Sequence, residues 1–223
     1  MRNQGFIIVL FGALVAAGVM LVALYFSKSQ RINRALRKAP RVNIAQASDG
    51  DYVKLVGTLE PIDQLAAPLS GRACSYYEVI VEEERGARNR TWSTVIRERD
   101  GCPFMINDGT AKARVELSEA ETALTQDGHW SSGFLNDADP ELEAYLARHG
   151  KSSTGLVFNR TLRYREGVLE PGEQVAVLGV IGREVDPDGQ SAGFREAPSR
   201  VNVSGEPNRP MRVSDDPSTL GEH

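Results

Sequence analysis

The side chains able to do metal or nucleophilic chemistry are few and far apart in this chain. They are Cys74, Cys102, His129, His149 and the terminal His223. The separations within the cysteine pair and within the internal histidine pair match none of the compact ligand spacings of tetrahedral zinc sites. Two cysteines also cannot form a disulfide framework. We therefore predict no metal site and no cofactor.

Cys74 raises the question of whether it reacts or packs, because it follows a glycine turn at Gly71 and precedes two tyrosines. A nucleophilic cysteine needs a base or a positive charge nearby to form a thiolate, and Arg72 alone offers one in the adjacent sequence. Free cysteine otherwise behaves as a small buried hydrophobe. We predict that Cys74 packs, with a redox or metal role as the alternative. The same prediction applies to Cys102, which stands before Pro103.

Acidic side chains in the same region would suit acid–base catalysis or a cation site. They are Glu82, Glu83, Glu84, Glu98, Asp100 and Asp108. Runs of charge are usually solvated faces or protected strand edges, and in "EEERGARNR" the glutamates are balanced by Arg85, Arg88 and Arg90. The sequence has neither a Gly-x-Ser-x-Gly turn nor a Gly-rich phosphate loop. We predict no catalytic residue, which favours a binding protein over an enzyme.

The N-terminal segment sets the environment in which the other elements work. Residues 6–26 carry no charge, and a helix of this length would span roughly 30 Å, the thickness of a bilayer core. The apolar run is long and lacks a signal-peptide cleavage site, so we predict an uncleaved transmembrane anchor over residues 1–27. Tyr25 and Phe26 suit the membrane interface.

A basic segment follows the predicted anchor, whereas Arg2 alone precedes it. The positive-inside rule then places the N-terminus outside and the rest of this single-pass protein in the cytoplasm, where its cysteines stay reduced. We interpret residues 28–46 as a basic juxtamembrane linker. The candidate lipid contacts are Arg31, Arg34, Lys38 and Arg41, which share one face of a continued helix. The alternative is that these residues only determine topology. Because the whole chain has a net charge of −4, the remainder is acidic and no nucleic-acid partner is predicted.

Beyond Pro40 the pattern changes to short alternating segments divided by turn residues, which indicates β strands. Apolar residues alternate in three of them: Val53, Leu55 and Leu59; Tyr77, Val79 and Val81; Val175, Val177 and Ile181. Asp108–Gly109 predicts a hairpin turn, Pro187–Gly189 a second turn, and residues 199–205 a last strand.

One helix is marked by Asp139 as N-cap, Pro140 at the first position, and Gly150 at the end. Its apolar stripe is Leu142, Tyr145 and Leu146. A weaker helical turn is predicted over residues 118–125. The fold class is therefore an N-terminal transmembrane helix plus a mostly antiparallel, barrel-like β domain of α+β type with one or two short helices. The β domain covers residues 47–204, and residues 205–223 are predicted to be a disordered tail because they lack a periodic apolar face.

Four segments in this order resemble the GIDE domain, also called the BAM (beside-a-membrane) domain. They are "GTLEPIDQLAAPLSGRACSYYEVIVEEE", "CPFMINDGTAKARV", "PELEAYLARHG" and "RYREGVLEPGEQVAVLGVIG". The family includes membrane-bound E3 ubiquitin ligases of mitochondria and plastids and prokaryotic relatives, to which this chain is more similar. The resemblance implies a β-rich domain close to the bilayer without known catalytic residues.

The chain departs from the ligases of that family, which carry a second membrane helix and a C-terminal RING domain. A RING needs eight Cys and His ligands for two zinc ions, and this chain has only 2 Cys and 3 His. We therefore expect no ubiquitin-transferase activity from this chain alone.

Pro68, Tyr76 and Tyr77 are the candidate protein-interaction surface, because tyrosine offers a large rigid contact area with a polar end. The alternative is that one tyrosine packs inward and the other shields a sheet edge. We predict a membrane-anchored, non-catalytic scaffold or interaction module whose partners are the bilayer and other membrane proteins. The alternatives are a component of an E3-ligase-like system and a lipid-sensing or envelope-organising protein. No small-molecule substrate is predicted.

Overall fold

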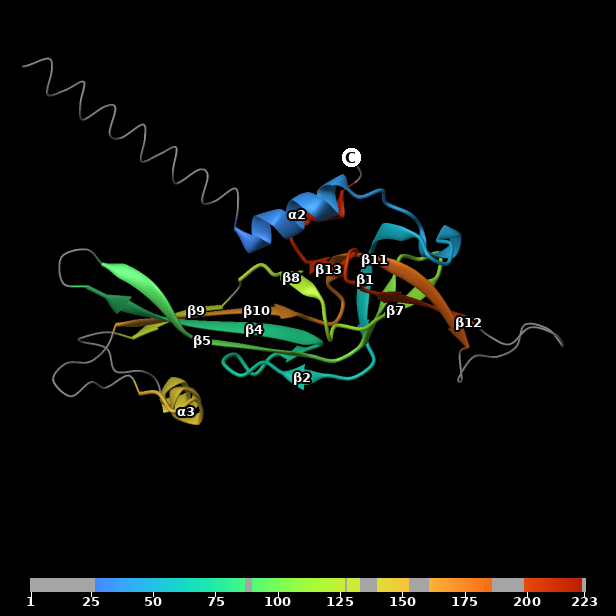
Figure 1. The fold of residues 1–223 in the computed structure, drawn as a ribbon. Helices are drawn as coiled ribbons and strands as arrows, with labels where there is room; N and C mark the ends of the chain where they lie inside the picture. Colours follow the sequence, from blue (N-terminus) through green and yellow to red (C-terminus); the bar gives the residue numbers. More distant parts are fainter. Residues whose placement is uncertain are drawn as a thin grey trace, which may run out of the picture.

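A computed structural model describes residues 27–86, 90–126, 128–132, 140–152, 161–185 and 199–221. The predicted membrane segment 6–26, the Asp139 cap and the Pro187–Gly189 turn lie outside these ranges. Among the described residues, no helix has the length and hydropathy needed to cross a membrane. The described chain forms an elongated body with a β barrel at one end and a second sheet at the other (Figure 1).

The barrel is a closed ring of five strands, in which β1 pairs with β6 on one side and with β11 on the other. Neighbouring strands are antiparallel except β7 and β12, which are parallel. This connectivity is that of an OB-type Greek-key barrel. In ring order the strands are β1 (Tyr52–Pro61), β6 (Phe104–Asn107), β7 (Lys112–Val115), β12 (Ser199–Ser204) and β11 (Gln174–Val185). The predicted barrel-like domain is confirmed.

Alternating apolar residues fill the barrel, as their spacing predicts. Val53, Leu55 and Leu59 of β1 are buried in one core with Val175 and Val177 of β11. Full burial of each such side chain stabilises the fold by about 1.5–3 kcal/mol. The predicted hairpin at Asp108–Gly109 is also confirmed, since β6 and β7 pair around it.

A glycine is needed where β1 and β6 meet. A Cβ atom at Gly57 would lie 2.5 Å from the backbone oxygen of Asn107, closer than real Cβ contacts come. The absence of a side chain therefore permits the close approach of the two strands at this corner of the barrel.

The second sheet has the order β5-β4-β10-β9 and is antiparallel. Its strands are β4 (Tyr76–Arg85), β5 (Thr91–Gly101), β9 (Gly128–Ser132) and β10 (Leu162–Leu169). The predicted helix is α3 (Pro140–Arg148), which lies under this sheet (Figure 1) and buries its apolar stripe against it. Gly150 has the positive φ of 64° that ends the helix. The predicted helix is thus confirmed. A separate short pair, β2 (Leu65–Ala66) and β3 (Ala73–Cys74), precedes β4.

Residues 28–46 are not a linker, which corrects the predicted domain boundary. They contain helix α2 (Lys28–Lys38) and a 3-10 turn, η1 (Ile44–Gln46). Ile32 and Leu36 of α2 are buried against the barrel, in one cluster with Ala176 and Leu178 of β11. These apolar residues, four positions apart, form the narrow stripe by which the helix packs on the domain.

Residues 205–221 are ordered as well, so the prediction of a disordered tail is wrong over the described part. They form β13 (Arg212–Ser214), which pairs with β11, and α4 (Pro217–Leu220). Met211 and Val213 are buried in the barrel core. Two alternating apolar residues are enough to hold this short strand, because β11 supplies the rest of the apolar surface against which it packs.

The predicted helical turn at 118–125 is also wrong, because this segment contains β8 (Glu121–Ala123). It pairs in parallel with β13, a partner far away in the sequence. The backbone N–H and C=O groups of β8 form hydrogen bonds with β13, so they need no partners within a local helical turn.

Candidate functional site

Helix α2 presents a basic face on the side away from the barrel. It lies over β8 and β13 on the upper side of the body in Figure 1. At 100° per residue, Arg31, Arg34 and Lys38 fall opposite the buried Ile32 and Leu36. Arg31 and Lys38 are exposed, and Arg34 is partly exposed. Docking of α2 therefore groups three of the four predicted lipid contacts on one outward surface, called here the α2 basic face.

Arg41 belongs to a different setting. It follows the helix, forms a β-bridge to Lys54 of β1, and donates from Nη1 to the backbone oxygen of Leu220 at 3.5 Å. The side chain is thus close to the C-terminal segment, away from the helical basic face.

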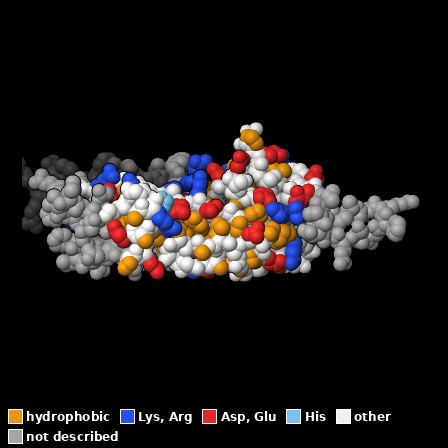
Figure 2. Space-filling view, turned by 90° about the horizontal axis from the view of Figure 1, so that it is seen from below, with side chains coloured by type: hydrophobic (Ala, Val, Ile, Leu, Met, Phe, Trp, Pro, Cys, Tyr) orange, Lys and Arg blue, Asp and Glu red, His pale blue; other side chains and the backbone are white. Residues whose placement is uncertain are grey.

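The face opposite α2 has a different character. Seen from below, the basic side chains of the described residues lie among acidic and hydrophobic ones (Figure 2). Its chemistry gives no comparable argument for contact with anionic lipid.

The predicted protein-interaction surface is corrected by burial. Tyr76 and Tyr77 are both buried, and they belong to different cores, Tyr76 to the barrel and Tyr77 to the sheet above α3. Successive residues of a strand point to opposite faces, and β4 is covered on both faces at this point. Pro68 is partly buried. The two tyrosines therefore join the two halves of the domain and offer little exposed contact area.

The buried tyrosines have hydrogen-bonding partners for their polar ends. The hydroxyl of Tyr76 lies 3.0 Å from that of Thr122, and Tyr77 donates to Glu98 Oε1 at 2.9 Å. Burial, followed by the contacts with Glu98, raises the pKa of Tyr77, so its hydroxyl stays protonated.

Glu98 connects β5 to α3. Its other oxygen, Oε2, lies 2.9 Å from His149 Nε2. Burial raises the pKa of Glu98, but the neighbouring Tyr145, Tyr77 and His149 side chains outweigh it and lower the pKa overall. His149, which follows the last residue of α3, is thus tied to β5 by a direct contact. Tyr77 and His149 each contact one oxygen of Glu98, so the three side chains form a structural link between the sheet and α3.

The acidic run at the end of β4 is paired with arginines, of which Arg90 is one that the sequence indicated. Glu82 accepts from Arg163 and Arg165 of the neighbouring strand β10, and Glu84 pairs with Arg90. Arg88 lies outside the described residues. Across the described ranges, no group of three or more His, Cys, Asp or Glu side chains is arranged to hold a metal ion.

Cys74 is fully buried, which confirms that it packs. Its Sγ donates to the backbone oxygen of Leu65 at 3.7 Å. Burial, with a smaller contribution from the charge of Glu166, raises the pKa of the Cys74 thiol to about 11. Cys102 is partly buried, and burial raises the pKa of its thiol too.

We expect Cys74 to be unreactive in the folded protein. With a thiol pKa of about 11, its thiolate fraction at pH 8 is roughly a hundredfold below that of an ordinary cysteine. In a Cys102→Ser variant, iodoacetamide should therefore modify Cys74 at least about a hundredfold more slowly than in denaturant. Mass spectrometry over time measures both rates, and equal rates would contradict the prediction.

A polar pocket of about 350 Å³ lies where the N-terminal end of α2, the end of β5 and the loop before β8 meet. The residues that give it chemistry are Lys28, Arg99, Ser118 and Glu119, and the buried Tyr76 forms part of its wall. No sequence pattern indicated this pocket, because its residues come from separate segments that only the fold brings together.

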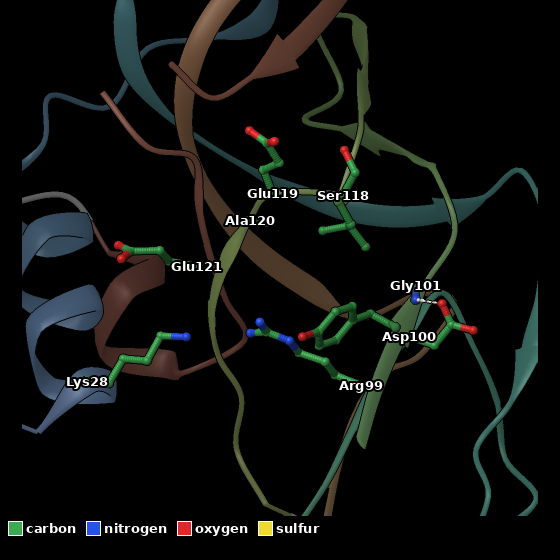
Figure 3. Close-up of a pocket in the computed structure, with 10 residues that line it drawn as sticks. Lys28, Arg99, Asp100, Gly101, Ser118, Glu119, Ala120 and Glu121 are labelled. Carbon is green, nitrogen blue, oxygen red and sulfur yellow. Dashed lines mark hydrogen bonds between the residues drawn. The ribbon is translucent and has the colours of Figure 1, made fainter. Parts of the chain in front are cut away.

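The charges in the pocket are not equivalent. In Figure 3 the Lys28 ammonium and the Arg99 guanidinium point toward each other from opposite sides. The Asp100 carboxylate turns back and accepts from the Gly101 N–H at 2.8 Å. Glu121 is paired with Arg212 at 2.9 Å. The central space therefore lies between two cations.

Comparison with known proteins gives no match: no protein-family model matches the chain, and no curated protein matches it. The resemblance to the GIDE domain thus stays a prediction.

Proposed function

We propose that this protein is a membrane-anchored, non-catalytic β-domain module that acts as a scaffold or interaction platform beside the membrane. Residues 1–27 would supply a single membrane helix with the N-terminus outside, and the β domain would lie on the cytoplasmic side. Other membrane proteins and the bilayer are its partners in this proposal.

The observation that carries the proposal is the docking of α2 on the barrel. Helix α2 begins at Lys28, with only Ser27 between it and the apolar segment, and its apolar residues Ile32 and Leu36 are buried against the domain. A flexible linker would let the domain tumble, whereas this helix joins the anchor to a rigid body. The domain would therefore keep one side toward the bilayer.

Tethering supplies the mechanism. Confining a binding surface to the membrane makes its encounter with another membrane protein effectively intramolecular, with effective concentrations that reach the millimolar range for short connections. A rigid connection adds a fixed orientation, so only partners of suitable height and position are engaged.

In-cell crosslinking followed by mass spectrometry tests this function. The full chain is compared with a variant in which residues 6–26 are replaced by an unrelated membrane helix, and with one that carries a flexible Gly/Ser insertion between Ser27 and Lys28. We expect the helix replacement to retain the captured partners and the insertion to reduce their capture. Loss of all partners on helix replacement would place recognition in the membrane segment and contradict the proposal.

Lipid sensing is a second candidate function, favoured by the α2 basic face. Neutralising Arg31, Arg34 and Lys38 together to Gln should reduce contact of α2 with nanodiscs that contain anionic lipid, since each charge contributes about 1 kcal/mol. Hydrogen exchange of α2 in anionic and neutral nanodiscs provides the measurement, with Arg97→Gln as an exposed control on β5. The same exchange pattern in the triple variant and the unmodified chain would argue against lipid sensing.

A further inference from the structure

The two faces of the second sheet differ in what they contact. Helix α3 covers one of them, and Val79 and Val81 of β4 are buried there. Successive residues of a strand point to opposite faces, so Glu78, Ile80 and Glu82 of β4 lie on the other face, called here the open face. Because α3 lies under the sheet in Figure 1, the open face is its upper side, the side on which α2 also lies.

Two arginines of the neighbouring strand lie over one glutamate on the open face. In the register of β10 with β4, Arg163 stands opposite Glu82, and Arg165 stands opposite the buried Ile80. Glu82 Oε2 accepts from Arg163 Nε at 2.5 Å and from Arg165 Nη2 at 2.8 Å. The Glu82 side chain is 11 % exposed, whereas those of Arg163 and Arg165 are 37 % and 30 % exposed. A partner that approaches this face therefore meets the two guanidinium groups, called here the arginine pair, before the carboxylate.

The arginine pair carries a surplus of positive charge. Burial raises the pKa of Glu82, but its hydrogen bonds with Arg163 and Arg165 and their charges outweigh it and lower the pKa overall. The carboxylate is therefore ionised, and one negative charge faces two positive ones. Within the described part of the chain each arginine uses one nitrogen on Glu82, while a guanidinium has five N–H donors. Donors and charge remain for an acceptor from outside.

Neighbouring carboxylates on the open face do not cancel this surplus, because each has an arginine of its own. Glu78 accepts from Arg97 of β5 at 2.9 Å, and Glu84 pairs with Arg90 at 3.5 Å. These are one-to-one pairs. The uncompensated charge of the face is thus located at the arginine pair.

Trp92 adds an exposed apolar surface beside the arginine pair. It lies on the open face because it stands opposite Glu84 of β4. The Cζ of Arg163 lies 4.2 Å from the centroid of its ring, a cation–π contact that restricts the guanidinium. The residue is 38 % exposed, one of two exposed large hydrophobic residues in the described part of the chain. Tryptophan and arginine are both enriched in the hot spots of protein interfaces.

The arrangement of α2 and the sheet favours a protein segment over a bilayer as the occupant. Figure 1 shows α2 lying above the level of the second sheet. A flat bilayer that rests on the α2 basic face would therefore not reach the arginine pair, whereas a chain segment can lie in the step between them. Guanidinium groups held by Glu82 and Trp92 also suit carboxylates, which arginine binds with two parallel hydrogen bonds.

We propose that the open face binds an acidic segment of a partner protein, with its carboxylates on the arginine pair and an apolar side chain against Trp92. The inference rests on the proposed function and deepens it, since it names the surface through which the platform engages another membrane protein.

Peptide binding by the full-length protein in phosphatidylcholine nanodiscs tests the inference. The probe is a fluorescent peptide of alternating Glu and Gly that ends in Leu, and Gln or Lys replaces Glu in two reference peptides. Fluorescence anisotropy should show binding of the acidic probe and weaker binding of both references. Arg163→Gln and Arg165→Gln should each weaken binding of the acidic probe about tenfold, the value of one charge-assisted hydrogen bond. Trp92→Ala should weaken binding of this probe but not of a version that ends in Gly.

Two further variants separate docking from a purely structural role of the ion pairs. Arg85→Gln removes an arginine that is paired with Glu83 on the α3 side of the same sheet, so binding should not change. Glu82→Gln removes the negative charge beneath the arginine pair and should leave binding as strong or stronger. If these pairs served only the fold, Glu82→Gln and Arg163→Gln would have the same effect. Thermal unfolding of every variant verifies that the sheet is intact.

Hydrogen exchange of the unmodified chain locates the contact without any substitution. The acidic probe should slow exchange in β10 and at the start of β5, and not in α2. Nanodiscs with phosphatidylglycerol supply the competing occupant: slower exchange in β10 with these, without binding of the acidic probe, would make the open face a lipid surface and overturn the inference. Equal binding of the Lys peptide, or protection confined to α2, would overturn it too.

In-cell crosslinking separates this inference from the proposed function. A variant with both Arg163→Gln and Arg165→Gln should lose captured partners, while Arg85→Gln should keep them. Capture that is unchanged in the double variant would overturn the open face as the docking surface and leave the platform itself in place. If the full chain captured no partner although the acidic probe bound, the platform proposal alone would be contradicted.

Discussion

Deletion of residues 205–223 is expected to unfold the β domain. The deleted segment contains Met211 and Val213 of the barrel core and strand β13, which bridges β11 and β8. Loss of each large buried side chain costs about 2–5 kcal/mol. The summed loss is therefore comparable to the whole free energy of unfolding of a typical domain, about 5–15 kcal/mol.

The deletion would also remove two hydrogen-bond acceptors of a buried charge. The Lys54 side chain is buried, and its Nζ donates to the backbone oxygens of Thr219 at 3.2 Å and Gly221 at 3.0 Å. Loss of hydrogen bonds to a buried ammonium is strongly unfavourable. Both effects act in the same direction.

Circular dichroism and thermal unfolding of the full and shortened chains in the same detergent measure this result. Asn208→Ala serves as the control, because Asn208 is exposed in the same segment and should change stability by less than about 0.5 kcal/mol. A shortened chain with an unchanged cooperative transition would mean that the segment is a dispensable tail after all.

Leu36→Ala should be the most informative single substitution in α2. Leu36 is fully buried between the helix and the barrel, beside Ile32 and Leu178. Removing its side chain leaves a cavity and should lower the free energy of unfolding by about 2–5 kcal/mol. If residues 28–46 were only a juxtamembrane linker, the same substitution would have almost no effect.

Hydrogen exchange of the α2 amides, combined with thermal unfolding, distinguishes undocking of the helix from loss of the whole fold. Lys38→Ala is the matched control, since it removes an exposed side chain from the same helix and keeps helix propensity high. We expect the α2 amides to exchange faster in Leu36→Ala than in the unmodified chain. In the control variant their exchange should be unchanged. Equal exchange in both variants would show that α2 is not held by its apolar residues, and would weaken the proposed rigid connection to the anchor.

The domain boundaries illustrate why sequence patterns failed at both ends of the fold. In α2 the apolar residues Ile32 and Leu36 were present at helical spacing, but six Lys and Arg residues between positions 28 and 41 favoured an interpretation in terms of charge. In the C-terminal segment, Pro, Ser and Asp surround Met211 and Val213, so no periodic stretch is long enough to predict a strand. Both segments are stabilised by surfaces that other strands supply.

The sequence by itself determined the local elements: the strands of the barrel, the hairpin at Asp108–Gly109, the helix from Pro140, and the packing of Cys74. These follow from side-chain period, turn chemistry and capping, which act over a few neighbouring residues. Tertiary structure alone decided the closure of the barrel, the burial of Tyr76 and Tyr77 in two cores, and the meeting of Lys28, Arg99 and Glu119 in one pocket. Each of these depends on which distant strands pair. The pairing is selected by the burial of apolar side chains over the whole domain, which cannot be deduced from any local stretch of the chain.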